Sequence, residues 1–242
     1  MLTILIPLRD EVENLPHIVR SFEENIKDIN YEVILINDFS KDKTFEESEK
    51  ICATNKNYKI LDNKKKGLGG ALNLGISVAR GDFICIVMAD LSDDVNDIKR
   101  YYHTIKEKKM DAVFGSRFLK SSKVEGYAIN KLILNRIFNF FVKILFLSPY
   151  NDFTNAFKIY KSEVLKSFLP LISESFNIFL EMPLKIISRK YSYEIIPINW
   201  YNRKKGKNKF NIKELRSKYL FTLIHCFTEK ILLRKRIKWI YL

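Results

Sequence analysis

Hydrophobic and polar positions alternate in blocks along the first half of the chain. Apolar runs that predict buried strands lie at residues 2–7, 31–36, 58–61 and 111–115, and a further run ends at Asp90. The segments between them predict helices at residues 13–25 and 45–54, a helix that ends at Ala79, and a helix at 95–108. Because strands and helices alternate with short links, we expect an α/β fold with a mostly parallel sheet flanked by helices.

This alternation stops beyond residue 120. The pattern there predicts an apolar helix at 132–147, a helix at 176–188 that contains Glu181, and a strand at 193–200. A loop at 151–158 carries a further acidic residue, Asp152. The helix at 132–147 is rich in Phe, Ile and Leu, so it is either a core helix or one that lies in a membrane interface.

The apolar run before Asp90 ends abruptly in carboxylates. Ligands of open α/β sheets collect outside the carboxyl ends of the strands, where Asp90 is expected to stand. With Ser92, Asp93 and Asp94 it offers the hard oxygen ligands that Mg²⁺ or Mn²⁺ prefers. The same residue types also suit the cap of the helix that starts near Val95. Taken alone, residues 90–94 favour the helix cap over a metal site.

Two other segments have the chemistry of phosphate sites. Three lysines precede Gly67-Leu68-Gly69-Gly70, which could hold a phosphate at a helix N-terminus. The spacing matches neither a P-loop nor a dinucleotide fingerprint, and a tight turn accounts for these glycines equally well. Arg117 follows a strand end, where it suits either a phosphate or a surface salt bridge.

The formal charge of +14 is concentrated at the C-terminus. Residues 203–238 contain thirteen Lys or Arg and two acidic residues, a net charge of +11. Nucleic acid, anionic lipid and phosphorylated substrates are the candidate partners. Apolar and aromatic residues alternate with the basic ones here, which is typical of a helix on an anionic membrane surface or of a core helix with a solvated basic face. No uninterrupted apolar run is long enough for a membrane span, and the three scattered cysteines predict neither disulfides nor zinc.

Seven short motifs follow one another in a specific order and spacing. They are residues 6–15, 37–44, 67–71 with 79–82, 115–117, 152–158, Glu181 and 203–209. Together they resemble the GT-A glycosyltransferases of family two, most closely the polyprenol-phosphate and dolichol-phosphate sugar transferases. The resemblance runs from residue 3 to about 215. It implies a Rossmann-like GT-A domain at residues 1–210, followed by a basic amphipathic, membrane-associating helical segment at residues 211–242.

The resemblance also implies roles for single residues. Asp90, Asp152 and Arg203 are expected at the catalytic centre, and Arg117 and Arg136 at the acceptor phosphate. The expected nucleotide-sugar site comprises Pro7, Arg9, Glu11, Asp38, Gly67, Gly69, Ala89, Glu181, Lys207 and Lys209. A divalent Mg²⁺ or Mn²⁺ ion is expected on Asp90, with Ser92 and Asp93 beside it.

The chain departs from the family pattern at several of these positions. Met88 stands where the D-A-D motif has its first aspartate, so only Asp90 carries over and the rest of the metal shell must come from Asp93, Asp94 or the diphosphate. Further substitutions within the motifs are Asn37, Phe39, Ala156, Lys158 and Asn208.

The activity implied is an inverting hexosyl transfer from a GDP- or UDP-linked sugar to a polyprenyl phosphate. The protein is expected on the cytoplasmic face of an anionic membrane, where a separate membrane-spanning partner could anchor it. A family-two transferase with a glycan or soluble acceptor is the nearest alternative. A silent nucleotide-sugar-binding relative is another alternative. A nucleic-acid-binding protein is the alternative from a different class, although no such motif occurs.

Overall fold

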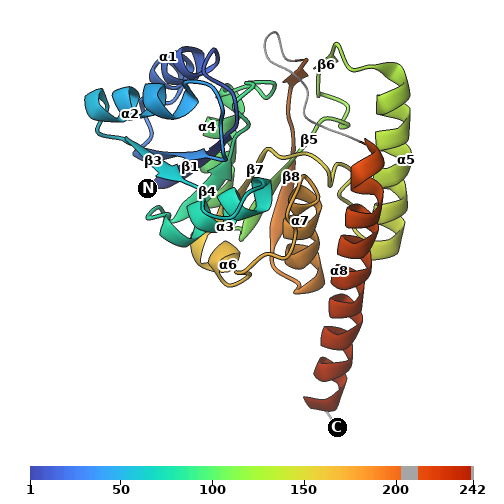
Figure 1. Cartoon of the computed structure of the whole chain (residues 1–242). Helices are drawn as coiled ribbons and strands as arrows, with labels where there is room; N and C mark the ends of the chain where they lie inside the picture. Colours follow the sequence, from blue (N-terminus) through green and yellow to red (C-terminus); the bar gives the residue numbers. More distant parts are fainter. Residues whose placement is uncertain (203–211, 241–242) are drawn as a thin grey trace.

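The computed structural model has a seven-stranded sheet at its centre (Figure 1). It describes the backbone of residues 1–202 and 212–240 and, in the last helix, the side chains of residues 217–233. The strand order is β3-β2-β1-β4-β7-β5-β8. The strands are β1 (Leu2–Leu8), β2 (Tyr31–Asn37), β3 (Tyr58–Asp62), β4 (Phe83–Ile86), β5 (Ala112–Ser116), β7 (Lys158–Lys161) and β8 (Tyr193–Pro197). A separate pair joins β6 (Val124–Glu125) to β9 (Trp200–Tyr201).

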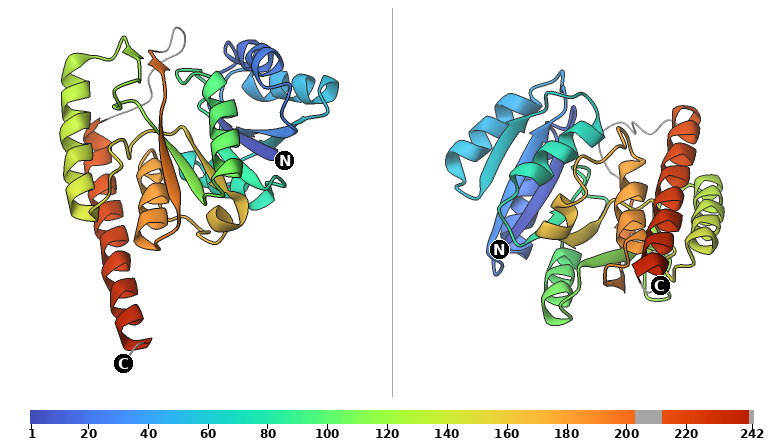
Figure 2. Two further views of the ribbon diagram at one scale, coloured as in Figure 1. Left: turned by 180° about the vertical axis from the view of Figure 1, so that it is seen from behind. Right: turned by 90° about the horizontal axis from the view of Figure 1, so that it is seen from below.

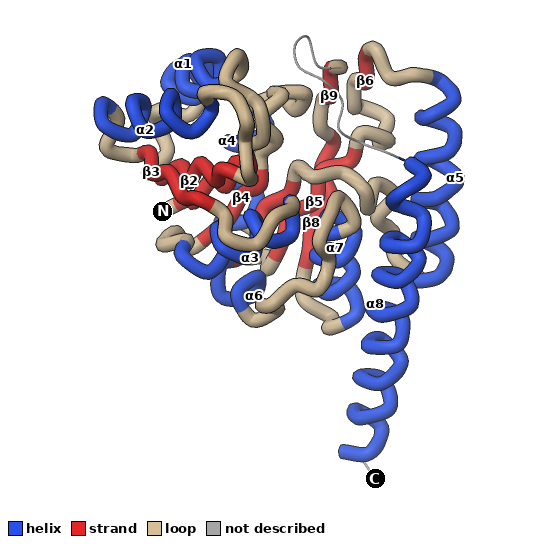
Figure 3. The backbone as a smooth tube through the Cα atoms, in the orientation of Figure 1, coloured by secondary structure: helices blue, strands red, loops and turns tan. Residues whose placement is uncertain are grey.

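Helices cover both faces of this sheet (Figures 2 and 3). They are α1 (Leu15–Asn25), α2 (Thr44–Thr54), α3 (Leu68–Val78), α4 (Asn96–Glu107), α5 (Ile129–Phe146), α6 (Ser162–Lys166), α7 (Ile178–Ser188) and α8 (Ile212–Ile240). One buried cluster lies between the sheet and α1, α2 and α4, and the other lies between the sheet and α3, α6 and α7. The expected α/β architecture is therefore confirmed.

The period-two pattern of the strands explains the two clusters. On β2, Val33 and Leu35 belong to the cluster under α1 and α4, whereas Ile34 and Ile36 belong to the one under α3. Every residue of β1 and β2 is buried. Such strands appear in the sequence as continuous apolar runs, which is why their ends could be predicted to within one residue.

Strand β7 is missing from the elements that the sequence predicts. It runs antiparallel between β4 and β5, where only a loop after Asp152 was expected. Its four residues, Lys158-Ile159-Tyr160-Lys161, carry a lysine at each end and are too short to show a period. The predicted strand at 193–200 is also divided, because β8 ends at Pro197 and β9 begins at Trp200.

Helices α5 and α8 lie side by side at one end of the sheet (Figure 1). Phe138 packs edge-on against Tyr219, and Phe146 against Phe227. On its other side α8 packs on α7, where Leu223 and Cys226 are buried. Within the described part of the chain, no helix is long and apolar enough to cross a membrane.

Candidate active site

The carboxyl ends of β1, β2 and β4 bring three of the predicted motifs together. The N–H of Asp38, just after β2, donates to Leu8 O at the end of β1 (2.7 Å). Residues 87–90 continue from β4 at the same edge, since Val87 N donates to Leu5 O of β1 (3.0 Å). In an open parallel sheet this edge is where a nucleotide binds.

Asp38 holds the glycine segment, residues 67–70. Its Oδ1 accepts the N–H of Gly67 (2.7 Å) and the amide of Asn63 (2.9 Å). Gly67 has a φ of +115° and is the N-cap residue, directly before α3. The buried carboxylate therefore fixes the loop that leads into a helix N-terminus, a geometry that suits a diphosphate. Its contact with a nucleotide base stays a prediction.

Asn63 contacts Asp38 and was not among the residues that the sequence predicts for the site. It is buried, and besides Asp38 its amide donates to Lys65 O (2.6 Å). Its Oδ1 accepts Lys65 N (3.1 Å). An asparagine between a strand and a Lys-Gly turn is a signal of such an Asx turn, and that signal could have identified it.

The family's glycine position after Asp38 is occupied by Phe39 in a left-handed conformation, with a φ of +57°. A residue with a Cβ is strained there, by about 1–2 kcal/mol. Neighbouring side chains hold the turn: Ser40 N donates to Asn37 Oδ1 (3.2 Å), and Asn37 donates to Asp62 (2.9 Å). The substitution therefore keeps the backbone that a glycine would favour.

The segment after β1 is tied to the same turn. Glu11 N donates to Thr44 Oγ1 (2.9 Å), and Asp10 N donates to Ser40 Oγ (3.1 Å). Pro7 is buried inside β1, and Arg9 is half-buried where the strand ends. The predicted residues Pro7, Arg9 and Glu11 therefore lie beside Asp38, and their contacts with nucleotide stay predictions.

The acidic stretch contains a helix cap, and it also places a carboxylate at the edge of the sheet. Asp94 Oδ1 accepts the N–H of Asn96, the first residue of α4 (3.0 Å), as a cap does. Ala89 is buried, and Asp90 is half-buried in the turn after β4, where its Oδ1 accepts Ser92 N (3.1 Å). Asp94 thus serves the helix, and Asp90 is left at the edge of the sheet.

Asp93 is buried beneath this turn. Its Oδ1 has no hydrogen-bond partner within residues 1–202 and the described side chains of α8. Burial, together with the neighbouring Asp90 carboxylate, raises the pKa of Asp93 to about 8. Two carboxylates with an unsatisfied oxygen form a donor set that fits Mg²⁺ or Mn²⁺.

The protein donors alone do not complete a metal shell. The described residues contain no group of three His, Cys, Asp or Glu side chains that could hold a metal. Mg²⁺ is commonly held by one or two carboxylates together with substrate phosphates. The residues present therefore fit a cation that binds with a diphosphate, and the metal ligands Asp90, Ser92 and Asp93 stay a prediction.

Arg117 and Asp152 form a buried ion pair. Arg117 donates to Asp152 through Nε (2.8 Å), Nη2 (2.7 Å) and its backbone N–H (2.9 Å). Neither side chain is more than 7% exposed. The salt bridge that the sequence left open thus exists, but it lies in the interior. The catalytic role of Asp152 stays a prediction.

Lys158 of β7 lies in the same buried region. It donates to the backbone oxygens of Phe153 (3.2 Å) and Asn155. Burial lowers the pKa of Lys158 to about 7, in opposition to the charge of Asp152. The lysine that replaces the family's arginine therefore stabilises the turn that carries Asp152.

Breaking the Arg117–Asp152 pair is expected to destabilise the fold. An Asp152→Asn substitution leaves a buried guanidinium without its carboxylate, which costs about 3–5 kcal/mol of unfolding free energy. Urea unfolding followed by circular dichroism measures this loss. The double variant Arg117→Met/Asp152→Leu should recover most of it, because no uncompensated charge remains. An Asp152→Asn loss no larger than that of Glu24→Gln in the exposed Arg20–Glu24 pair would contradict the structural role.

Arg136 lies on the exposed side of Arg117. Its guanidinium stacks 4.7 Å from the centre of the Phe118 ring. Both arginines line an open pocket of about 510 Å³, together with Phe118, Ile133 and Ile137 among others. The pocket combines cationic groups with apolar walls, and phosphate binding by Arg117 and Arg136 stays a prediction.

Glu181 lies in the first turn of α7. It is fully buried, and its two oxygens accept the N–H groups of Ile172 (3.1 Å) and Ser173 (2.8 Å). The structure thus gives this carboxylate a loop as its partner, and a direct sugar contact stays a prediction. Arg203, Lys207 and Lys209, the remaining predicted site residues, lie outside the described residues.

The sequence matches a known protein family over more than half of the chain. The model of the family "Glycosyl transferase family 2" matches residues 3–169. The chain is 26% identical to a dolichol-phosphate mannosyltransferase of Pyrococcus furiosus, over 88% of this chain and 60% of the relative. It is also 26% identical to a dolichyl-phosphate beta-glucosyltransferase of Dictyostelium discoideum, over 82% and 66%. The chain thus spans less than two thirds of the length of these curated relatives.

Solved structures show the same fold. Glucosyl-3-phosphoglycerate synthase from Mycobacterium tuberculosis, in complex with Mn²⁺, UDP and glucosyl-3-phosphoglycerate, superposes with a TM-score of 0.69 at 13% identity. The match covers 94% of this chain and 80% of that one. A complex of the same synthase with Mg²⁺ and UDP also has a TM-score of 0.69. The expected GT-A fold is therefore confirmed. Because the family model matches more than half of this chain, the chain belongs to glycosyltransferase family 2.

Proposed function

We propose that this family 2 glycosyltransferase moves a hexose from a nucleotide-diphosphate sugar to the phosphate of a polyprenyl lipid, with inversion, at a membrane surface. The observation that supports a lipid as the acceptor is an unusual exposed surface next to the Arg136 pocket. We call it the apolar face. It comprises the exposed large apolar side chains of α5 and α8: Ile129, Ile133, Leu134, Ile137, Phe140, Phe141, Ile144, Leu220, Phe221, Ile224, Ile231 and Leu232.

The apolar face and the pocket are continuous. Ile133 and Ile137 are exposed on α5 and also line the pocket beside Arg136. Soluble proteins rarely expose contiguous apolar patches of this kind without a partner. A phosphate at Arg136 with an isoprenoid tail along α5 satisfies both features. Lys131 and Arg136 are exposed on the same helix and suit anionic headgroups.

The donor half of the site supports a nucleotide sugar. Asp38, the glycine segment and Asp90 stand along one sheet edge, and the similar fold of the glucosyl-3-phosphoglycerate synthase was solved with UDP-glucose and Mn²⁺. We infer that Asp38 and Glu11 lie against the nucleoside and that the glycine segment lies against the diphosphate. Asp90 and Asp93 would hold Mg²⁺ or Mn²⁺, which when bound neutralises charge on the leaving diphosphate.

The remaining chemistry needs little proton transfer from the protein. A phosphate monoester acceptor is already an anion near neutral pH, so positioning and charge stabilisation carry the reaction. Arg136 would orient the acceptor oxygen, and the ring of Phe118 would fix the guanidinium. The Asp152–Arg117 pair lies behind Arg136 and keeps the wall of the pocket in place.

The test compares acceptors with the purified protein. With Mn²⁺ and a panel that includes UDP-glucose and GDP-mannose, we expect transfer to a short polyprenyl phosphate and none to free sugars or to 3-phosphoglycerate. An Arg136→Gln variant should raise the acceptor KM about tenfold or more and leave nucleotide binding unchanged, because it removes a charge-assisted contact. Transfer to 3-phosphoglycerate but not to the lipid would overturn the lipid acceptor and leave the family assignment intact.

A further inference from the structure

The feature that the proposed mechanism leaves unexplained is the buried carboxylate of Glu181. It lies at the start of α7, and a charge in such a place is costly unless it is fully paired. Its partners are two backbone N–H groups of one short loop and Lys185, whose Nζ lies 3.8 Å from Oε1. We call residues 171–175 the bridging loop.

The bridging loop packs directly on the glycine segment. Gly69 N donates to Glu174 O (3.0 Å). A Cβ added to Gly67 would lie 2.8 Å from that same oxygen, and a Cβ on Gly69 would collide with Ser173 O. The glycines are therefore required because the loop backbone approaches so closely. Any shift of the loop must move the segment that Asp38 holds.

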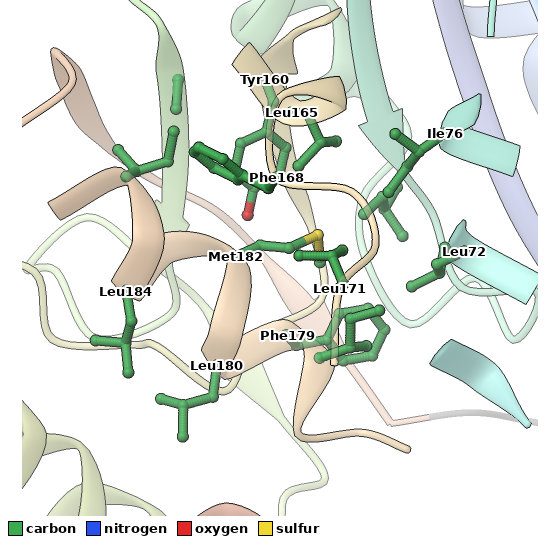
Figure 4. Packing of buried hydrophobic residues seen from close by; sticks show 14 of the residues in the cluster. Leu72, Ile76, Tyr160, Leu165, Phe168, Leu171, Phe179, Leu180, Met182 and Leu184 are labelled. Atoms are coloured by element: carbon green, nitrogen blue, oxygen red, sulfur yellow. The ribbon is translucent and has the colours of Figure 1, made fainter. Parts of the chain in front are cut away.

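Helix α3 fixes the loop from a second side. The side chain of Asn73 donates to Leu171 O (3.1 Å) and accepts Leu171 N (2.8 Å). The Leu171 side chain lies in the core between Leu72 of α3 and Met182 of α7 (Figure 4). The loop thus connects the helix that begins at the glycine segment with the helix that carries Glu181.

Helix α8 fixes the bridging loop from a third side. Ser173 Oγ and Thr222 Oγ1 are 3.2 Å apart, and Asn177 donates to the same Thr222 oxygen (2.9 Å). Glu229 of α8 pairs with Lys185 of α7 (3.3 Å) and with Arg189, the residue directly after α7 (2.5 Å). A continuous set of hydrogen bonds and ion pairs therefore joins α8, part of which forms the apolar face, to Asp38.

We propose that Glu181 is a positioning residue for the nucleotide: through the bridging loop it holds the glycine segment in the conformation that receives the diphosphate, without touching the sugar. The inference rests on the nucleotide site of the proposed function. It replaces a sugar contact with a loop contact, and it makes α8 a structural support of the donor site.

The test uses Glu181→Gln. Glutamine keeps the shape but offers one acceptor oxygen where two N–H groups need one each, so an amide nitrogen faces a loop N–H. We expect the Kd for UDP or GDP with Mn²⁺, measured by calorimetry, to rise about tenfold, the usual order for an unsatisfied buried donor. The Kd for the matching nucleotide sugar should rise by the same factor. Amide exchange of residues 171–175 should accelerate.

A second variant separates the loop from Glu181 itself. Asn73→Ala removes both bonds to Leu171 from the opposite side and should weaken nucleotide binding in the same way. The double variant should bind little worse than either single one, because both act on one loop. Ile105→Val, a core substitution on the other side of the sheet, controls for general loss of stability and should leave the Kd unchanged.

Two results would overturn the proposal. A Glu181→Gln protein that binds the nucleoside diphosphate normally but the nucleotide sugar poorly would show a direct sugar contact. Unchanged affinity for both in Glu181→Gln and Asn73→Ala would show that the loop does not control the site. If the wild-type protein binds neither UDP nor GDP, the proposed function fails together with this inference, whereas wild-type binding with unaffected variants overturns the inference alone.

Discussion

Sugar transfer by an Asp90→Asn variant is expected to fall at least about 100-fold, the scale on which loss of one charge-stabilising group acts. Asp90 follows β4 at the sheet edge where Asp38 follows β2, and Met88 replaces the family's first metal aspartate. No second aspartate of that motif can compensate. Asparagine retains the Oδ1 that accepts Ser92 N, so the turn and the melting temperature should be preserved.

The measurement pairs transfer with Mn²⁺-dependent nucleotide binding. In Asp90→Asn the gain in UDP or GDP affinity on adding Mn²⁺ should disappear, whereas metal-free binding should persist. Asp94→Asn is the matched control, because asparagine caps a helix as well as aspartate does and Asp94 serves α4. Wild-type turnover in Asp90→Asn, or an equal loss in Asp94→Asn, would contradict the assignment of Asp90.

The Asp93→Asn substitution is expected to have two effects, one on metal-dependent binding and one on stability. If the unsatisfied Oδ1 of Asp93 completes the metal shell, the substitution weakens Mn²⁺-dependent binding. At alkaline pH the unfolding free energy of Asp93→Asn should also be higher than that of the wild type. A pKa raised to about 8 means that folding favours the protonated form, so stability is lost as pH increases from the unfolded value towards 8. Asparagine removes that loss.

The central strands β1 and β2 could be predicted because they are buried on both faces. The ends of β1 and β2 lie within one residue of the ends of the apolar runs, and the residues after them, Asp38 among them, fall at the ligand edge by topology alone. Strand β7 could not be predicted in this way. Its position between β4 and β5 depends on contacts made by Ile159 and Tyr160 with residues distant in the chain, which no local pattern contains.

The sequence also did not show which residues the charged side chains of the site contact. Arg117 and Asp152 are 35 residues apart. The sequence left the partner of Arg117 open between a phosphate and a salt bridge, and in the fold Arg117 and Asp152 bind each other. Glu181 shows the same limit: its spacing identified a family position, but its burial and its two N–H partners depend on how residues 172 and 173 pack against α7. A motif indicates which residues matter, and only the packing shows what they contact.

The proposed membrane surface can be tested without removing α8. Deleting the C-terminal segment would expose Leu223 and Cys226 of the core, and it would break the Glu229 pairs with α7, so lost membrane binding could reflect unfolding. The predicted division at residue 210 therefore calls for point substitutions. Phe140 and Ile144 are suitable because they are 64% and 56% exposed, lie one helical turn apart on α5, and do not line the Arg136 pocket.

Glutamate at both positions is expected to release the protein from anionic vesicles. Each apolar side chain that enters the interface contributes about 1–2 kcal/mol, so the double variant should partition at least about 30-fold more weakly in a sedimentation assay. Transfer to a short, water-soluble polyprenyl phosphate should remain near the wild-type rate. The control Ser77→Glu/His103→Glu makes the same charge change on exposed positions of α3 and α4 and should bind vesicles almost normally.

Lysine at Phe140 and Ile144 then separates apolar insertion from charge attraction. If the apolar face enters the bilayer, the lysine variant also binds neutral vesicles poorly, and it recovers only part of its binding on anionic ones. If attraction between basic residues and headgroups is the whole effect, the lysine variant binds anionic vesicles better than the wild type. That second outcome, or a glutamate variant that sediments as the wild type does, would leave the apolar face without a lipid partner and would favour a second protein surface as its cover.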